Sequence, residues 1–566
     1  MQTKNLEDNF AQITTYSQQV KSQLDPIMLL QALSSEDKAA NRMLLESCQI
    51  DNKQKVKSIL MNKAALRIEC QQQVVTITSL TDNGYYALEF LATQFNQEIK
   101  KLSGNLTQLS IQYQSPLSIF SSQQLDEEQR LKQITPIDCL RTIQTSFKSK
   151  NNHPFALFLC GLFSFDFIAS FEDLPEVPFA DNDCPDFVFY LAEEIIVFDH
   201  QKSKTHVYLN QFSTNESQNI NQTYNDRIEQ ISSVMQNKDL TSSSKTINTD
   251  FSTINNNLTD IEKVSCDLTD QEYEDVVIDL KKQIVAGNIF QVVPSRTFSL
   301  KCLNTLQSYQ QLKITNPSPY MFYMQDENFI LFGASPESAL KYQTSNNKVD
   351  LYPIAGTRPR GKKENGEIDH DLDKRLEVEL KLDFKEVAEH MMLVDLARND
   401  IARISDTGSI KIPRLIEVDR YSQVMHLVSC VEGNLKQDLD CFHAYQACMN
   451  MGTLTGAPKI KATELIRQTE KKRRGSYGGA VGYINTQGDM DTCIVIRSAF
   501  CKNGVAHIQA GAGIVFDSQP KAEADETKAK AAAVINAIQQ ANLSIIESST
   551  SNSQSSSQSS NNQSAS

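Results

Sequence analysis

Glycine is concentrated near the C-terminal end of this 566-residue chain, where a backbone could hold an anion. Residues 452–513 contain ten of the twenty glycines. Glycine weakens helices and strands, so this density favours segments that approach a ligand closely or offer their amides to a negative group. Tight turns in an antiparallel sheet are the alternative. Three clusters in succession favour a site, and they are Gly452–Gly456, Gly475–Gly482 and Gly511–Gly513.

A single arginine stands between the second and third clusters. The alternating run Cys493–Phe500 predicts one continuous strand. That alternation places Arg497 on the face it shares with Val495 and Ala499. A guanidinium in such a position is costly unless it meets an anion. An internal salt bridge is one possibility, and a bound carboxylate beside the glycines is the other.

Two predicted helices carry acidic residues suited to a hard cation. The helix dipole alone favours acidic residues in a first turn, so a purely structural role is open for each helix. One glutamate from each helix could also hold a divalent cation, with water and a substrate carboxylate completing the shell. The first helix covers roughly 383–403 with Glu386 and Glu389 on one face, and the second starts near Pro520 and carries Glu523, Asp525 and Glu526.

His426 lies among hydrophobic residues, which is typical of a histidine in a core. It is also the residue type best suited to proton transfer near neutral pH. The sequence has no nucleotide-binding glycine loop. It also lacks the glycine-flanked cysteine of a glutamine amidotransferase. If the chain uses glutamine nitrogen, another subunit must release it.

Composition excludes several classes of protein. The 55 basic and 69 acidic residues give a net charge of −14, which disfavours a nucleic-acid partner. The dense basic run Lys471–Arg474 is typical of a solvated loop. The twelve cysteines are scattered without zinc spacing and are expected to be small core residues. Without a long apolar run or a secretory signal, we expect neither a membrane span nor export, and hence a cytoplasmic protein.

The length predicts two packed globular segments rather than one core. We expect an N-terminal region over 1–212 and a catalytic region over 264–543. Asn, Ser, Thr and Gln dominate 213–263, which predicts a polar linker or insertion. Residues 544–566 are nearly all Ser, Asn and Gln and are expected to form a disordered tail.

The C-terminal segment resembles the chorismate-utilising enzymes over nearly all of 264–543. Members of this family have an α+β fold in which two stacked, largely antiparallel sheets are covered by helices. The resemblance implies this αββα sandwich here, with the active site in a cleft between domains. The motifs that carry the resemblance are Pro353–Gly361, Glu389–Asp400, the three glycine clusters and Ala524–Thr527.

The resemblance also implies a role for each matching site residue. Glu389 and Glu526 would hold Mg²⁺, which would bind the ring carboxylate of chorismate. Glu337 would protonate the departing 4-hydroxyl and His426 would assist the loss of pyruvate, with Thr453 as a third catalytic residue. The substrate would be bound by Gly356 and Thr357 along the ring, by Tyr477 and Arg497 at the enolpyruvyl carboxylate, and by the backbone amides of Gly511, Ala512 and Gly513 at the ring carboxylate.

Two positions indicate the reaction within the family. Gln291 replaces the lysine that activates water in isochorismate and salicylate synthases, and Ala355 replaces the nucleophilic lysine common in aminodeoxychorismate synthases. Both replacements favour direct attack by ammonia, as in the large subunits (component I) of anthranilate synthases. Such a subunit is a Mg²⁺-dependent lyase that opens tryptophan biosynthesis by making anthranilate and pyruvate.

The resemblance implies that a separate glutamine amidotransferase subunit supplies the ammonia, with a heterotetramer expected. Two alternatives stay open. One is the large subunit of an aminodeoxychorismate synthase, and the other is a non-catalytic tryptophan-binding protein.

The N-terminal string Leu44–Ser47, followed by Lys57, resembles the segment that holds inhibitor tryptophan in regulated members. Taken without the resemblance, it is two core leucines beside a solvated pair. Together with Asn316–Met321 and Val481–Tyr483, it implies feedback inhibition by L-tryptophan. The residues implied are Glu46, Ser47, Lys57, Pro319, Tyr320, Met321, Val481 and Tyr483.

Overall fold

The computed structural model describes residues 10–22, 24–36, 40–48, 55–101, 107–115, 125–212, 218–237, 263–421 and 424–561. Twenty-three strands form one hydrogen-bonded network, and β12 (Gln291–Val292) and β21 (Gly456–Ala457) form a separate pair. The described strand pairings are antiparallel except for β1 with β7 (Phe147–Ser149).

Two long strands, β3 (Lys55–Gln71) and β9 (Phe187–Asp199), pair with each other and belong to both sheets. At one end they are flanked by β2 and β10, and at the other end by β4 and β8. The network therefore divides into two sheets on either side of this shared pair.

On one side, the first sheet continues from β9 through β10 (Lys204–Gln211) to β1 (Ala11–Val20). On the other side, it continues from β3 through β2 (Arg42–Cys48), β14 (Tyr320–Gln325), β15 (Ile330–Ser335), β24 (Ser498–Lys502), β25 (Val505–Gly511) and β13 (Ser295–Lys301) to β11 (Ser265–Cys266). On one side, the second sheet continues from β3 through β4 (Val74–Ser79) and β6 (Thr107–Gln112) to β5 (Lys100–Lys101). On the other side, it continues from β9 through β8 (Leu159–Phe163), β22 (Ala480–Ile484), β23 (Met490–Ile494), β16 (Ser338–Gln343) and β17 (Lys348–Leu351) to β20 (Val424–Asn434). β20 also pairs with β18 (Ile354–Pro359) and β19 (Lys411–Arg420).

Three hydrophobic cores separate four layers. The alternation along β14 shows why, because Phe322 and Met324 face the core between the sheets whereas Met321 and Tyr323 face the outer helices. The first sheet packs against α1 (Pro26–Glu36), α6 (Gln218–Gln236), α10 (Thr305–Thr315) and α15 (Pro520–Asn561). The second packs against α2 (Asp82–Phe95), α5 (Ile137–Ser146), α12 (Phe384–Ile404) and α13 (Cys441–Cys448).

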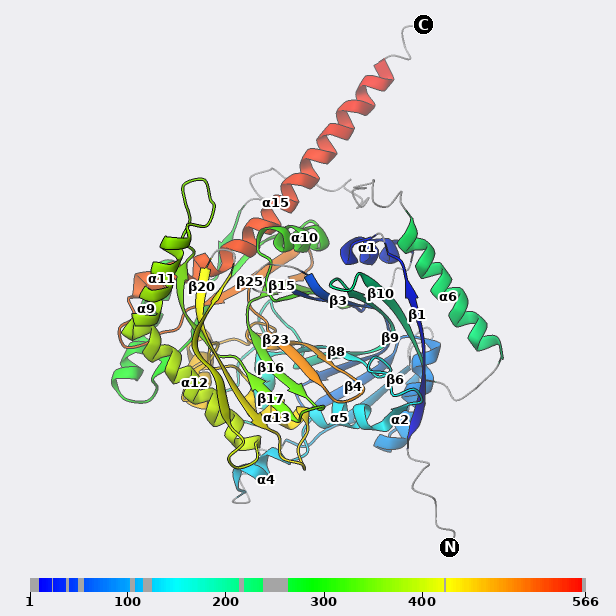
Figure 1. Cartoon of the computed structure of the whole chain (residues 1–566), viewed down its shortest axis with the longest axis horizontal. Helices are drawn as coiled ribbons and strands as arrows, with labels where there is room; N and C mark the ends of the chain where they lie inside the picture. The colour runs from blue at the N-terminus through cyan, green and yellow to red at the C-terminus, as the bar shows by residue number, and fades with distance from the viewer. Residues whose placement is uncertain are drawn as a thin grey trace.

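Figure 1 shows this order, with α1 and α10 on one side of the strands and α2, α5 and α13 on the other. The α+β fold with an αββα arrangement is therefore confirmed. The remaining described helices are the 3₁₀ segment η2 (Phe165–Ser170), α4 (Glu127–Leu131), α9 (Asp270–Val285), α11 (His370–Leu382) and α14 (Lys459–Glu470).

The two predicted globular segments interleave within both sheets. β2 pairs with β14 in the first sheet, and β8 pairs with β22 in the second. Within 213–263, α6 forms a helix whose Ile228, Ile231 and Met235 are buried. At the C-terminal end, α15 continues past 543 to Asn561.

The predicted strand Cys493–Phe500 is wrong. β23 ends at Ile494 and β24 begins at Ser498, because the chain crosses there from the second sheet to the first. Arg497 lies in this crossing with a left-handed backbone (φ 50°), so strand alternation does not set its direction. The two acidic helices are confirmed as α12 and α15.

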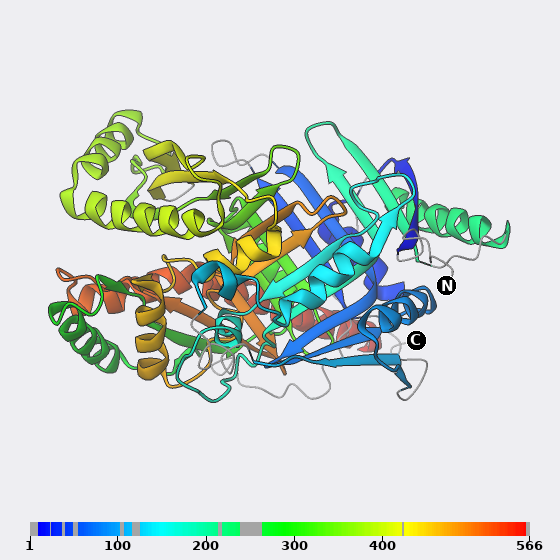
Figure 2. The same ribbon diagram turned by 90° about the horizontal axis from the view of Figure 1, so that it is seen from below.

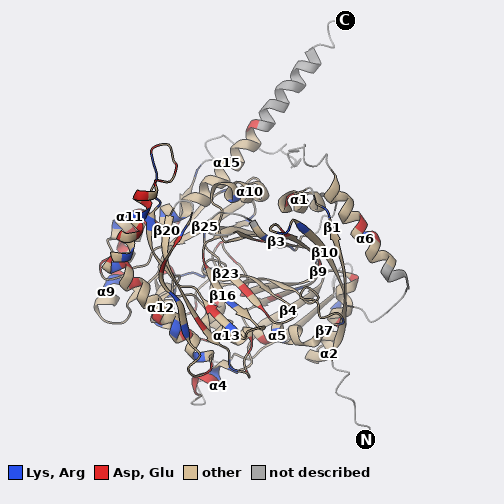
Figure 3. Ribbon diagram, viewed as in Figure 1, with Lys and Arg blue, Asp and Glu red and all other residues tan. Residues whose placement is uncertain are grey.

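Charged residues are mixed over the surface, with Lys and Arg beside Asp and Glu on α11 and α12 (Figure 3). None of the twelve cysteines, which all lie in the described ranges, forms a disulfide; most are buried as expected, whereas Cys266 is exposed. Among the helices of the described residues, none is long and apolar enough to cross a membrane.

Candidate active site

His426 lies beside Gly356 and Thr357 on neighbouring strands β20 and β18. Its Nδ1 is 3.2 Å from the carbonyl oxygen of Gly356 and 3.0 Å from Oγ1 of Thr357. Because a carbonyl oxygen can only accept, Nδ1 carries the hydrogen and Nε2 is left as a proton acceptor. Burial lowers the pKa of His426 to about 4, so the ring is neutral at physiological pH. His426 is therefore suited to act as a base.

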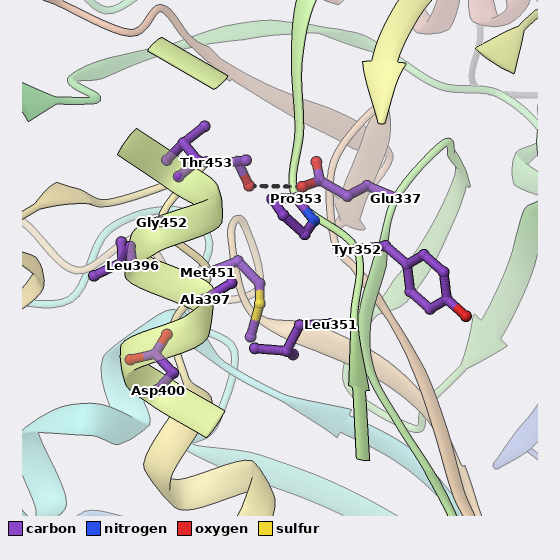
Figure 4. A pocket seen from close by; sticks show the side chains of 11 residues that line it. Glu337, Leu351, Tyr352, Pro353, Leu396, Ala397, Asp400, Met451, Gly452 and Thr453 are labelled. Atoms are coloured by element: carbon purple, nitrogen blue, oxygen red, sulfur yellow. Dashed lines mark hydrogen bonds between the residues drawn. The ribbon is translucent and has the colours of Figure 1, made fainter. Parts of the chain in front are cut away.

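Glu337 is a buried carboxyl between β15 and β16. Oγ1 of Thr453 donates a hydrogen bond to its Oε1 at 2.9 Å (Figure 4). Burial raises the pKa of Glu337 to about 8, although the charges of Lys530 and Arg497 act in the opposite direction. Glu337 therefore holds a proton at neutral pH and is suited to act as an acid. With Thr453 and residues of α12 it lines a small pocket.

Arg497 is a cation without a partner among the described residues. None of the hydrogen bonds or ion pairs there involves its guanidinium, and burial lowers its pKa. Tyr477, Glu526 and Glu337 are close enough to attract its charge. The salt bridge considered for Arg497 is thus not formed, and the group is free to bind an anion.

The third glycine cluster ends β25 beside these groups. A Cβ on Gly511 would lie 3.1 Å from the Tyr477 hydroxyl, and one on Gly513 would lie 2.6 Å from Nε2 of Gln291. The backbone at Gly511 and Gly513 can therefore come this close to the site only because these residues have no side chain. The amide of Ala512 already donates to the carbonyl of Pro294, which corrects the expectation that it faces a substrate carboxylate. Within the described part of the chain, no backbone carbonyl is recorded as accepting from the amide of Gly513.

Glu389 on α12 and Glu526 on α15 face each other across the site. Burial raises the pKa of Glu389 to about 7, and repulsion from Glu386 and Glu526 adds to this effect. Burial also acts to raise the pKa of Glu526, but Lys530, paired with it at 2.6 Å, lowers it overall. Within the described ranges, no three His, Cys, Asp or Glu side chains are grouped as metal ligands.

These residues nevertheless fit a hard divalent cation. Carboxylate oxygens are the ligands that Mg²⁺ prefers, and two repelling carboxylates gain stability when a cation lies between them. Figure 2 shows the yellow-green α11 and α12 facing the green α9 and the orange-red start of α15, so the two helices that carry the glutamates come from opposite sides.

Two site residues escaped the assignment from sequence. Lys530, one helical turn after Glu526, also donates to the carbonyl of Gly511 at 2.9 Å. Its i+4 spacing from Glu526 was a usable signal. Gln291 donates through Nε2 to Oε1 of Glu389 at 2.8 Å, and its buried Oε1 has no partner. Because its hydrogen bond to Glu389 fixes the amide NH₂ group of Gln291, the Oε1 of Gln291 is available to accept a hydrogen bond from an N–H group.

The residues expected to bind tryptophan divide between the core that lies between the two sheets and the outer face of the first sheet. Strand alternation directs Ser47 to the core between the sheets, where Tyr320, Val481 and Tyr483 also pack. Nζ of Lys57 lies 5.0 Å from the Phe155 ring of the same core. The half-buried Asp491 joins this group and accepts from the Tyr320 hydroxyl at 3.1 Å.

Glu46 and Met321 face the outer helices instead. Glu46 is held by Tyr309, by Lys313 at 2.7 Å and by Ser58, so its carboxylate is already satisfied. Its expected role in binding tryptophan therefore stays a prediction. Pro319 lies at the edge of the group, where its carbonyl accepts from the amide of Cys48.

The basic run Lys471–Arg474 is only partly the solvated loop expected. Arg473 and Arg474 are buried, and their charges are matched by Asp186 and Glu470. Glu470 stands four residues before Arg474 and was visible in the local pattern, whereas Asp186 is far away in the chain and was not.

Known proteins match this chain over most of its length. The family model described as chorismate binding enzyme matches residues 83–536. Anthranilate synthase component 1 of Vibrio cholerae is 51% identical over 514 residues, which cover 91% of this chain and 94% of that protein. The Escherichia coli protein of the same name is 48% identical over 499 residues, with 88% and 91% covered.

This chain belongs to the anthranilate synthase component 1 family. The crystal structure of anthranilate synthase component I from Streptococcus pneumoniae superposes with a TM-score of 0.62 at 28% identity, covering 85% of this chain and 92% of that one. As a member of the component 1 family, the chain is an enzyme of chorismate utilisation. The family resemblance drawn from the motifs is confirmed.

Proposed function

We propose that this chain converts chorismate and ammonia to anthranilate and pyruvate. The observation that carries the proposal is the unpartnered guanidinium of Arg497 beside a protonated Glu337 and a neutral His426. Chorismate is a dianion whose conversion needs one acid and one base. An aminodeoxychorismate synthase would stop before the loss of pyruvate, which is the step that His426 is placed to assist.

The residues divide the reaction between them. Arg497 and Tyr477 bind the enolpyruvyl carboxylate, and the amide of Gly513 faces the ring carboxylate. Glu389 and Glu526 would hold Mg²⁺, which, when bound, supplies positive charge that neutralises the ring carboxylate. Glu337 gives its proton to the 4-hydroxyl, which leaves as water while ammonia adds at C2. The amine formed at C2 loses its extra proton to solvent. Nε2 of His426 then takes the proton from C2 as the C3–O bond breaks, and the released enolpyruvate becomes pyruvate when its methylene carbon is protonated.

The first experiment combines the purified chain with chorismate, Mg²⁺ and ammonium salt. We expect anthranilate, identified by fluorescence and chromatography. Aminodeoxychorismate without an aromatic product would move the chain to the rival reaction. No turnover at all would favour the non-catalytic alternative.

We propose that a glutamine amidotransferase subunit normally supplies the ammonia, and that Gln291 positions it. Exchange of Gln291 for leucine removes the free Oε1. Loss of a buried hydrogen-bond acceptor costs about 1–3 kcal/mol, so we expect the KM for ammonia to rise roughly 5- to 100-fold. Steady-state kinetics with ammonium salt measures this effect.

The matched control is Gln468→Leu, because Gln468 also donates to a glutamate, Glu464, but lies exposed on α14. We expect this variant to keep the wild-type KM for ammonia. A Gln291→Leu enzyme with an unchanged KM would show that Gln291 does not contact the nucleophile.

We also propose that L-tryptophan binds beside Ser47, Tyr320 and Asp491 and inhibits the enzyme. Asp491 can accept the ammonium group and Lys57 can bind the carboxylate. β23 connects the two sites, because Asp491 lies near its start and the amide of Ile494 at its end donates to the carbonyl of Glu337 at 3.0 Å. Tryptophan bound to this strand would therefore weaken chorismate binding by linkage.

Exchange of Ser47 for leucine fills the space in which tryptophan would lie. Overpacking costs about 1–3 kcal/mol, so we expect the inhibition constant for tryptophan to rise roughly tenfold or more, with kcat retained. Tryptophan titrations of the activity measure this, with exposed Ser17→Leu on β1 as the control. Unchanged inhibition would place the tryptophan site elsewhere.

A further inference from the structure

The loop 449–458 between α13 and α14 presents Thr453 to Glu337. Because Oε1 of Glu337 accepts from Thr453, the proton of the carboxyl sits on Oε2. If the loop moved, either carboxyl oxygen of Glu337 could carry the proton, and its O–H bond would no longer point in one fixed direction. The position of this loop therefore matters to the acid step of the proposed function.

The side chain of Lys459 connects the two ends of this loop. Its Nζ donates to the carbonyl of Cys448, the last residue of α13, at 2.7 Å, although Lys459 itself begins α14. The same Nζ donates to Asp400 of α12 at 2.6 Å. The two side chains are 8% and 9% exposed, so the pair is shielded from water. Figure 4 shows Asp400 on the pocket that Glu337 and Thr453 also line.

Arg474 holds the middle of the same loop. Its Nη1 donates to the carbonyl of Leu454, the residue after Thr453, at 2.8 Å. Its Nη2 donates to the carbonyl of Val293, two residues after Gln291, and to Glu470 at 2.6 Å. The guanidinium is 5.5 Å from the centre of the Tyr477 ring. Arg474 thus connects the backbone beside Thr453 with two substrate-binding segments.

We infer that Lys459 and Arg474, with their carboxylates Asp400 and Glu470, are positioning residues that fix Thr453 against Glu337. A buried ion pair is a poor source of stability compared with hydrophobic residues of similar volume. Both cations here also donate to backbone carbonyls of one loop or its ends, which gives that loop a single position. This inference rests on the proposed function, because it concerns the acid of that reaction.

The test uses the full-length chain with chorismate, Mg²⁺ and saturating ammonium salt. The double variant Asp400→Asn/Lys459→Met removes the pair without leaving a buried charge. We expect kcat to fall roughly 10- to 100-fold, the effect of a misplacement on the order of 1 Å, while the KM for chorismate changes less than about twofold. Arg474→Lys, which keeps the charge but cannot reach both carbonyls, has the same expected effect.

Each change is then repeated in a Thr453→Val background, where we expect no further fall in kcat. The matched control is Arg67→Met/Asp326→Asn, which removes an equally buried pair between β3 and the residue after β14 that lies outside the site. It is expected to lower thermal stability but not kcat.

Three results would overturn the inference. They are wild-type kcat in the folded variants, a loss that adds fully to that of Thr453→Val, or an equal loss of kcat in the control. If Asp400→Asn/Lys459→Met does not fold, Arg474→Lys carries the same comparison. A wild-type chain that makes no anthranilate would instead refute the proposed function.

Discussion

Exchange of Glu526 for glutamine is expected to lower kcat/KM for chorismate about 10³-fold, since charge stabilisation by a bound metal is worth several kcal/mol. The change keeps the shape of the side chain but removes one of two facing carboxylates. Lys530 loses its partner at the same time and leaves the site with excess positive charge. Glu389→Gln is expected to have an effect of the same order.

The measurement is activity as a function of Mg²⁺ concentration, combined with calorimetric titration of Mg²⁺ in the presence of product. Asp525→Asn is the matched control, because Asp525 is the preceding residue of α15 and its side chain is 60% exposed. We expect it to retain activity and Mg²⁺ binding. Undiminished Mg²⁺-dependent turnover by Glu526→Gln would refute the metal assignment.

Exchange of Glu337 for glutamine is expected to lower kcat about 10²- to 10⁴-fold, the usual contribution of an acid or base. The pH profile separates this role from a structural one. Because the pKa of Glu337 is raised to about 8, the protonated form required for catalysis dominates below pH 8 and is lost as the pH rises through that value. His426, with its pKa lowered to about 4, stays a base down to that pH.

With Mg²⁺ saturating and the concentration of free ammonia held constant, kcat/KM for chorismate should therefore fall as the pH rises through about 8. The alkaline limb should disappear in Glu337→Gln. As a control, Glu172→Gln changes a carboxyl whose pKa burial also raises, but which pairs with Arg130 outside the site. If the alkaline limb persisted in Glu337→Gln, the loss of activity at high pH would have to come from another titrating group.

The elements that carry the chemistry could be predicted from local sequence, whereas their long-range partners could not. The helix that became α12 was predictable because its apolar residues recur with helical spacing and Asp383 caps its start. The crossing at Arg497 was not, because the alternation of Cys493–Phe500 is the same whether a strand continues or changes sheets. Only the pairing of β23 and β24 with different strands decides between the two.

Buried charges posed the same difficulty. Arg474 belongs to a basic run that looks solvated, yet Glu470 and two backbone carbonyls satisfy it inside the protein. The direction of Glu46 depends on Tyr309 and Lys313, more than 260 residues away in the chain. Apart from the pair of Arg474 with Glu470, which are four residues apart, these contacts arise only when distant segments pack, so a single sequence carries no local signal for them.

The two strands shared by both sheets also have an evolutionary consequence. β3 carries Lys57 of the proposed inhibitor site and continues into the second sheet beside β9. Removing the N-terminal segment would strip β14 and β22 of their neighbours β2 and β8, leaving two strand edges open to aggregation. We therefore expect that deletion cannot separate the proposed feedback inhibition from catalysis. A descendant freed from that inhibition is expected to arise by exchange of individual side chains, with the whole scaffold retained.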